Sequence, residues 1–179
     1  MPSPQKAKGS SWEREVARYL TQQFGQTFIR APGSGAYVGG TNNIRKQFLH
    51  QGQIRSFKGD IVPGESFSAL NAECKSYKDF PFHQLFQGSV KILDQWIEQC
   101  MDAADTGDFN ILFMKFNRKG RYVAFQAQPN HTNLFLTRHF NYGTQHHGHW
   151  FIMDMDLFFE LNSNKFAELC SNQIATVAA

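Results

Sequence analysis

The sequence predicts a mixed α/β sandwich in which helices cover a central β-sheet. The first observation is the order of periodic segments, which is helix, three strands, helix, two strands, and then a strand followed by helix. The second is the length of 179 residues, which suits one domain with a sizeable core. The third is a hydrophobic content of 41%, with 18 Phe, which is typical of a packed globular protein.

The first half of the chain contains a helix, a short strand and a hairpin. Residues 10–24 have apolar side chains at helical spacing, and Ser10 with Glu13 has the spacing of a capping box. Residues 27–30 read as a strand, and residues 59–75 as a hairpin that turns at Gly64. The polar, basic and glycine-rich residues between them, 33–58, are expected to form a long loop that orders on a polyanion. A flexible insertion with no special role is the alternative.

The second half is predicted to begin with a helix over about residues 82–104, with Pro81 in its first turn. The segments expected after it are a hairpin of two strands, a loop rich in Asn, His and Gly, a strand and two helical segments. In chain order they span residues 108–116 and 121–126, 127–148, 150–153, and 156–161 and 164–174.

Several classes of protein are disfavoured by composition. No apolar run approaches the roughly 20 residues that cross a bilayer, so no membrane role is expected. The N-terminus lacks the apolar core of a signal peptide, which predicts a cytoplasmic protein. Cys74, Cys100 and Cys170 form no Cys-x-x-Cys pair, which argues against a disulfide framework and against a thiolate zinc site.

The positive charges are clustered, and the net charge of +3 is compatible with binding to nucleic acid. A solvated basic face is the simpler interpretation of each cluster taken alone. The three clusters are Lys6, Lys8, Arg14 and Arg18; Arg30, Arg45, Lys46, Arg55 and Lys58; and Lys115, Arg118, Lys119 and Arg121.

The segment from Gly59 to Lys75 carries the strongest functional signal. Side chains alternate along a strand, so Glu73 and Lys75 are expected on one face, and the predicted hairpin returns Asp60 beside Glu73. Two carboxylates and an ammonium then converge, and a hard cation such as Mg²⁺ prefers such oxygen ligands. The backbone carbonyl of Cys74 could add a further ligand. This pattern suggests a metal-dependent nuclease.

Simpler interpretations compete with this one. Glu-x-Lys on an exposed strand is often a solvated pair of opposite charges. Five histidines in the late loop are the rival metal ligands, but their spacing is not that of a fixed metal site: His131, His139, His146, His147 and His149. Phe57 and Tyr77 flank the site motifs and are expected to be buried, with stacking on bases as the alternative.

Four motifs in order resemble those of the PD-(D/E)XK nuclease superfamily, and within it the Hjc-type Holliday junction resolvases of archaea and phages. The motifs are Lys8-Gly9-x-x-x-Glu13-Arg14-Glu15, Ile29-Arg30-x-x-Gly33-Ser34, Asp60-Ile61-Val62 and Glu73-Cys74-Lys75. The resemblance covers the N-terminal half, to about Trp96. It implies a restriction-endonuclease-like core in a single nuclease domain spanning residues 1–179, in a prokaryotic or phage-infected cell.

The resemblance also implies roles for individual residues. The catalytic residues would be Glu13, Asp60, Glu73 and Lys75. A Mg²⁺ ion, for which Mn²⁺ would substitute, would be held by Asp60, Glu73 and the Cys74 carbonyl, with Glu13 as a further candidate. The residues expected to bind DNA are Lys8, Arg30, Ser34, Arg45, Lys46, Arg55 and Lys58. A glutamine on the second helix would support the site, and Gln84 and Gln87 are equal candidates.

The resulting hypothesis is a structure-selective endonuclease that cuts four-way junctions in pairs as a homodimer. Two departures from the pattern matter: Gly59 precedes Asp60 where the family name has Pro, and the segment from Ser34 to Asp60 is longer than in compact archaeal members. The alternatives are therefore a sequence-specific phage or homing endonuclease of the same fold, and a non-catalytic DNA-binding module.

Overall fold

A computed structural model of the protein describes residues 4–32, 58–131 and 133–171. These residues form three α-helices, two sets of strands and three short 3₁₀ helices. The α-helices are α1 (Pro4–Phe24), α3 (Lys91–Ala103) and α4 (Met155–Cys170). The strands are β1 (Ile29–Arg30), β2 (Ile61–Val62), β3 (Leu70–Tyr77), β4 (Phe109–Phe116), β5 (Gly120–Gln126), β6 (Phe140–Gly143) and β7 (His149–Asp154). The 3₁₀ helices are η2 (Glu65–Phe67), η3 (Phe82–Gln87) and η4 (Pro129–His131).

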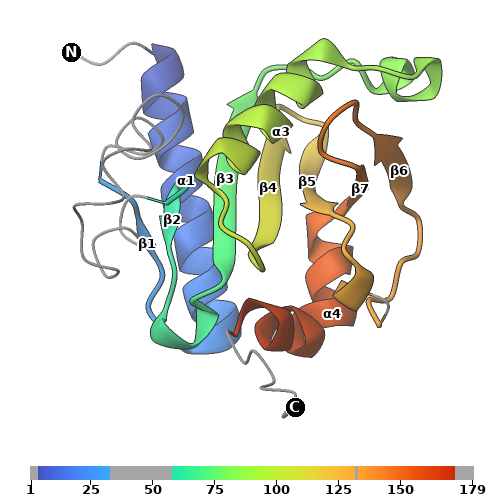
Figure 1. Ribbon diagram of the computed structural model, residues 1–179. Coiled ribbons are helices and arrows are strands. Elements are labelled where there is room, and N and C mark those ends of the chain that lie inside the picture. The colour runs from blue at the N-terminus through green and yellow to red at the C-terminus, as the bar shows by residue number, and fades with distance from the viewer. Residues whose placement is uncertain (1–3, 33–57, 132, 172–179) are drawn as a thin grey trace.

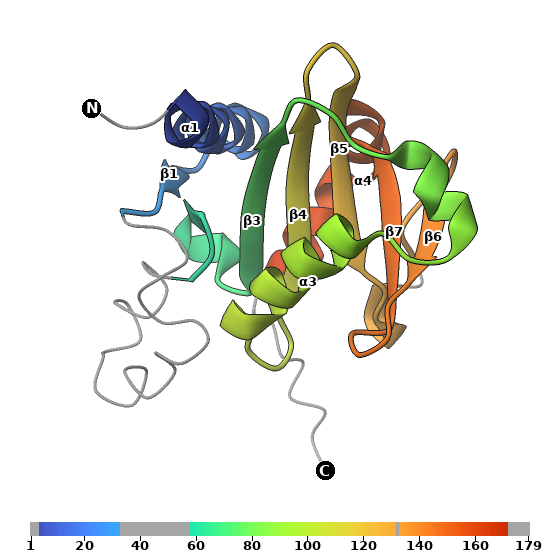
Figure 2. The same cartoon turned by 90° about the horizontal axis from the view of Figure 1, so that it is seen from above.

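The predicted α/β sandwich is confirmed. The main sheet has five strands in the order β3-β4-β5-β7-β6, with β3 parallel to β4 and the other neighbours antiparallel. Helices α1 and α4 lie on one face of this sheet and α3 crosses the other (Figures 1 and 2). A separate two-stranded ribbon of β1 and β2 lies next to α1 and β3 (Figure 1). Within the described residues, β3 is therefore an edge strand.

Each face of the sheet has its own hydrophobic core. Under α1 and α4 the core is dominated by aromatic rings, and Phe113 and Phe159 stack there with centroids 6.2 Å apart. Under α3 the core includes Trp96 and Phe116, with centroids 6.3 Å apart, and the fully buried Trp150. The alternation of side chains along β4 and β5 supplies both cores from the same strands.

Helix α1 begins earlier than expected. It starts at Pro4, six residues before Ser10, so Ser10 and Glu13 lie inside the helix and do not form the predicted capping box. Proline is favoured in a first helical turn, so Pro4 suits the start of α1. Trp12 fixes the helix to the sheet, because its indole N–H donates to the Phe113 carbonyl at 2.8 Å.

The single helix predicted over residues 82–104 is wrong. The chain forms η3, then breaks at Gly88, whose φ is +108°, and enters α3 at Lys91. Apolar residues three apart, Phe82 and Leu85, fit a 3₁₀ turn as well as an α-helix. The left-handed conformation at Gly88 ends the first piece.

Two predictions for the C-terminal third are also wrong. The expected loop over residues 127–148 contains β6, which pairs with β7 through Phe140 and Tyr142 opposite Ile152 and Trp150. The two expected helical segments are one helix, α4. Asn162 lies inside this helix, where its buried side chain donates to the Phe158 carbonyl at 3.1 Å and accepts from the Phe135 N–H at 2.7 Å, so its polar atoms do not end the helix.

The buried His131 predicts a dependence of stability on pH. Its ring lies against Phe109, with centroids 4.8 Å apart, and burial lowers its pKa from 6.5 to about 4. The unfolded chain therefore binds this proton more readily, so stability is fully present above about pH 6.5 and falls as the pH approaches 4. We expect the melting temperature to fall between pH 7 and pH 5 by more in the wild type than in His131→Phe. Both proteins carry the same carboxyl groups, so their difference isolates His131; equal slopes would contradict the prediction.

The long loop predicted over residues 33–58 lies outside the described residues except for Lys58. Among the described residues, no helix is both long enough and apolar enough to cross a membrane.

Candidate active site

The site lies at the outer edge of β3, where the chain from Lys58 to Val62 runs alongside the strand. The Asp60 N–H donates to the Ala72 carbonyl at 2.8 Å, and the Cys74 N–H donates to Asp60 Oδ2 at 2.8 Å. The expected hairpin does not form, because β2 pairs with β1 and not with β3. The expected outcome of that hairpin is nevertheless present, since Asp60 lies beside Glu73.

Gly59 makes this close approach possible. Its φ is +64°, a conformation that side chains other than glycine rarely adopt, and a Cβ atom there would lie 2.4 Å from the Ala72 carbonyl oxygen. The departure from Pro-Asp thus has a physical reason in this chain, because proline cannot adopt a positive φ.

Glu73 and Lys75 lie together on the α3 side of β3. The Lys75 ammonium donates to Glu73 Oε1 at 2.8 Å and to Gln99 Oε1 at 2.6 Å. The Gln99 amide in turn donates to Glu73 Oε1 at 2.6 Å. Gln99 comes from α3, which crosses this face of the sheet (Figure 2). The three side chains form a closed network in which each restrains the other two.

The carboxyl groups of Asp60 and Glu73 lie close together in the site. Asp60 and Glu73 are 5% and 2% exposed, and their side chains are close enough to hydrogen-bond. Burial, followed by the charge of Asp60, raises the pKa of Glu73 to about 8, although Lys75 opposes the shift. The pair is thus electrostatically unfavourable when both groups are ionised, and a bound cation would relieve it.

Glu13 approaches from the other side of β3. It is 8% exposed on α1 and forms an ion pair with Arg30 of β1. Burial raises the pKa of the Cys74 thiol, and the charges of Asp60, Glu73 and Glu13 raise it further. Three acidic side chains therefore surround the backbone at Cys74, with Asp60 at the edge of the strand and the other two on opposite faces.

The oxygen atoms at this edge suit a hard divalent cation. Asp60 and Glu73 offer carboxylate oxygens, and the Cys74 carbonyl faces the same edge as its N–H, which bonds to Asp60. Among the described residues, no group of three or more His, Cys, Asp or Glu side chains is arranged to hold a metal. A cation here would therefore take its remaining ligands from backbone and water, as Mg²⁺ commonly does.

The residues expected to bind DNA are placed very differently. Lys58 is 6% exposed and forms ion pairs with Asp108 and with Asp105, so its ammonium is directed into the protein. The prediction that Lys58 contacts DNA is therefore not supported. Arg30 is held by Glu13 and keeps 30% of its side chain exposed. Four further candidates lie outside the described residues: Ser34, Arg45, Lys46 and Arg55. Lys8 belongs to α1, but its side chain is outside the described part of the structure.

Neither glutamine proposed as a support for the site fills that place in the structure. Gln84 and Gln87 belong to η3, whereas the glutamine that bonds to Glu73 and Lys75 is Gln99. Sequence reasoning missed Gln99 because it assumed one continuous helix from residue 82. Its signal was its place beside the apolar stripe of Trp96, Ile97 and Cys100, which faces the sheet.

The network predicts that Gln99 positions the site. Replacing Gln99 by Leu should lower kcat for DNA cleavage by about 10- to 100-fold, because Glu73 and Lys75 lose a shared partner. Steady-state kinetics should show the loss mainly in kcat, and Gln99→Glu should not restore it, because it adds a third negative charge. The matched control is Gln95→Leu, an exposed position on the same helix, which should leave kcat unchanged. Equal effects at the two positions would contradict the prediction.

The third basic cluster is largely neutralised within the protein. Lys115 pairs with Glu15 at 2.6 Å, Arg121 pairs with Asp156 at 2.6 Å, and Lys119 pairs with Asp79 at 2.6 Å. These contacts fit the simpler interpretation of a solvated, ion-paired face for most of this cluster.

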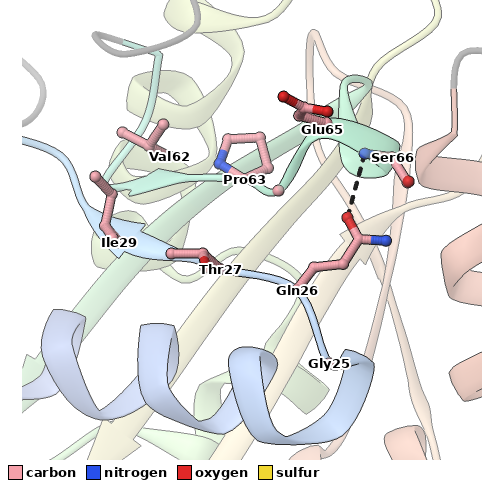
Figure 3. A pocket seen from close by; sticks show the side chains of 9 residues that line it. Gly25, Gln26, Thr27, Ile29, Val62, Pro63, Glu65 and Ser66 are labelled. Carbon is pink, nitrogen blue, oxygen red and sulfur yellow. Dashed lines mark hydrogen bonds between the residues drawn. The ribbon is translucent and has the colours of Figure 1, made fainter.

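A pocket of about 570 Å³ lies beside the β1–β2 ribbon (Figure 3). Ile29 and Val62 line one side, and Gln26 accepts a hydrogen bond from the Ser66 N–H at 3.3 Å on the other. Its only charged lining residue among the described ones is Glu65, so the pocket does not suit a phosphate group.

Comparison with known proteins identifies a family for the chain. No curated protein and no solved structure matches the chain. The family model described as "Phage putative PDDEXK endonuclease" matches residues 4–168, which include α1, the site and most of α4. The five-stranded mixed sheet with flanking helices is accordingly a restriction-endonuclease-like core. The chain therefore belongs to this family of phage PD-(D/E)XK endonucleases.

Proposed function

We propose that this protein is a Mg²⁺-dependent endonuclease that selects branched DNA and resolves four-way junctions by paired cleavage as a homodimer. The observation that carries the proposal is the convergence of the Asp60 and Glu73 carboxyl groups beside the Lys75 ammonium at the edge of β3. The resemblance to junction resolvases supports the choice of substrate, and the family of phage endonucleases supports the reaction class.

Asp60, Glu73 and the Cys74 carbonyl would hold the Mg²⁺ ion. When bound, Mg²⁺ supplies a Lewis acid for a phosphoryl oxygen and lowers the pKa of a coordinated water. Asp60 is oriented for its task by the Cys74 N–H, which leaves its second oxygen, Oδ1, directed away from that bond. Mn²⁺ would substitute, since it accepts similar oxygen ligands.

Lys75 would act on the scissile phosphate. Its ammonium is 2.8 Å from Glu73 and 2.6 Å from Gln99, so its position is fixed before DNA arrives. A fixed positive charge stabilises the negative charge that develops on a phosphate under attack, without a cost of reorganisation. Lys75 could also hold the attacking water, because an ammonium has three donors.

Glu13 and Arg30 would form a second point of contact. The carboxylate of Glu13 fixes the guanidinium of Arg30, which remains partly exposed and could meet a DNA phosphate. Glu13 would then act through Arg30, and its role as a metal ligand would require this ion pair to open. Binding through such contacts depends on salt and on DNA shape rather than on sequence.

A homodimer would match the symmetry of the substrate. Two equivalent strands of a four-way junction must be cut, and a two-fold dimer places two identical sites in corresponding positions.

A sequence-specific phage endonuclease is the second candidate. The family match supports a phage endonuclease and does not specify its DNA substrate. It therefore favours this candidate as much as the first. The third candidate, a DNA-binding module without activity, is disfavoured by the buried pair of Asp60 and Glu73, because a protein that only binds phosphate has no use for it.

The experiment that tests the proposal is cleavage of a labelled immobile four-way junction, beside linear duplexes of the same arm sequences, with Mg²⁺ and with EDTA. The proposal expects symmetric paired nicks in the junction alone, which are lost in EDTA. Cleavage of linear duplex at a defined sequence would replace it by the second candidate. Binding to either DNA without cleavage would replace it by the third.

A further inference from the structure

Tyr77 lies on the same face of β3 as the site. It follows Lys75 by two residues, and side chains two apart in a strand point to one face, about 6.6 Å from each other. Helix α3 contacts both, through Gln99 at Lys75 and through Trp96 at Tyr77. On this face of β3, Tyr77 is therefore the side chain next to Lys75, the group proposed to meet the scissile phosphate.

The Tyr77 side chain packs against Trp96 and remains partly exposed. Its centroid is 4.8 Å from that of Trp96, which is only 4% exposed and packs in turn against Phe116. Tyr77 itself is 43% exposed. The contact with Trp96 restrains the ring, so a partner could stack on it with little loss of side-chain freedom.

Two exposed basic residues, Lys78 and Arg118, lie near the end of β3 that carries Tyr77. The Asn117 N–H donates to the Tyr77 carbonyl at 3.2 Å, which places the turn between β4 and β5 beside the end of β3. Arg118 in this turn is exposed, and so is Lys78, which follows Tyr77. Neither side chain forms an ion pair within the described part of the chain, in contrast to Lys119, which pairs with Asp79.

From this arrangement we propose that Tyr77, backed by Trp96, is a stacking subsite for a nucleobase that has left the double helix, and that Arg118 and Lys78 contact the adjoining phosphates. Exposed aromatic rings together with nearby basic side chains are the combination that binds unpaired strands. A base inside an intact duplex is covered on both faces by its neighbours, so the subsite selects DNA with an unstacked base near the cut. The inference rests on the proposed function and names the structural feature of DNA that the same site recognises.

The test measures binding and base stacking, separately from cleavage, in an Asp60→Asn background. The probes are a branched DNA with 2-aminopurine at the branch point and a linear duplex with the same base paired, both without divalent metal. The Asp60→Asn protein should bind the branched DNA and quench its fluorescence through the Tyr77 ring. Changing Tyr77 to Leu should weaken binding of branched DNA by at least about fivefold and remove the quenching, with less than about a twofold effect on duplex.

Two further variants separate stacking from a structural role. Tyr77→Phe keeps a ring and should retain both affinity and quenching. Phe86→Leu removes a ring that is 82% exposed and lies against Phe140 on a different element, and it should change neither readout. Melting temperatures of all variants confirm that each is folded.

The outcomes distinguish this inference from the proposed function. Equal losses for branched and linear DNA in Tyr77→Leu, or retained quenching, would overturn the subsite whatever the enzyme cleaves. If the wild-type protein with Mg²⁺ cuts no DNA but the selective loss and the quenching change occur, the subsite stands and the proposed reaction fails.

Discussion

Replacing Asp60 by Asn is expected to lower the rate of DNA cleavage by at least about a thousandfold while leaving the fold intact. The change removes the negative charge that would hold the cation but keeps the size of the side chain. The amide oxygen of the new side chain can still accept the hydrogen bond that the Cys74 N–H makes to Asp60 at 2.8 Å. Single-turnover cleavage, DNA affinity and melting temperature should be measured together, and only the first should change strongly.

Glu73→Gln should have the same effect on cleavage and should not destabilise the protein. Burial and the nearby Asp60 raise the pKa of Glu73 to about 8, so its ionised form is disfavoured in the fold, whereas an amide carries no charge to bury. Divalent cation should raise the melting temperature of the wild type, because a ligand of the folded state stabilises it, and this rise should disappear in both variants.

The matched control for these two variants is Asp102→Asn, at an exposed position on α3. It changes the net charge by the same amount, but among the described residues it forms no hydrogen bond or ion pair with Asp60, Glu73 or Lys75, so cleavage and the response to cation should stay at wild-type levels. Normal cleavage by Asp60→Asn or Glu73→Gln would show that the site is wrongly assigned.

Gly59→Ala is expected to damage both stability and activity. Any side chain at φ +64° costs about 1–2 kcal/mol in backbone strain. The added Cβ would also lie 2.4 Å from the Ala72 carbonyl oxygen, so the backbone must move away from β3. Asp60 would move with it, and a displacement of about 1 Å at a catalytic group costs about a hundredfold in rate.

Comparison with Gly25→Ala separates the clash with Ala72 from the backbone strain. Gly25, at the end of α1, has almost the same φ, +65°, but a Cβ added there would have no atom within 4 Å. We expect the two variants to share the backbone strain, measured by chemical denaturation, and only Gly59→Ala to lose cleavage. Equal activity in the two variants would show that the approach of Gly59 to Ala72 does not position the site.

Sequence reasoning identified the parts of the site that depend on local geometry. Glu73 and Lys75 are two residues apart in a strand, and this spacing alone places them on one face. The approach of Asp60 was inferred from a hairpin that does not form, yet the Asp60 N–H still donates to the Ala72 carbonyl of β3. The prediction that Asp60 lies near Glu73 was right because the connection between Asp60 and the start of β3 is short and leaves Asp60 few other positions.

The parts that were missed depend on contacts far apart in the chain. Gln99 reaches Glu73 from 26 residues away, and it is the packing of α3 on the sheet that brings the two side chains together. Lys58 looked like an exposed cation because its partner Asp108 is 50 residues further on and was placed in a separate strand. Local patterns also misplaced α3 and divided α4, since the bonds that satisfy Asn162 inside α4 include bonds to Phe135, 27 residues away, and cannot be read from helix propensity.

The position of β3 at the edge of the sheet also bears on the solubility of the protein. An edge strand presents unpaired backbone groups that can recruit a strand from another molecule. Here Asp60 occupies the groups of Ala72 and Cys74, while Glu73 and Lys75 place charge at the neighbouring positions. The residues that build the site therefore also shield the sheet from self-association, so variants that remove several of them at once risk aggregation as well as loss of activity.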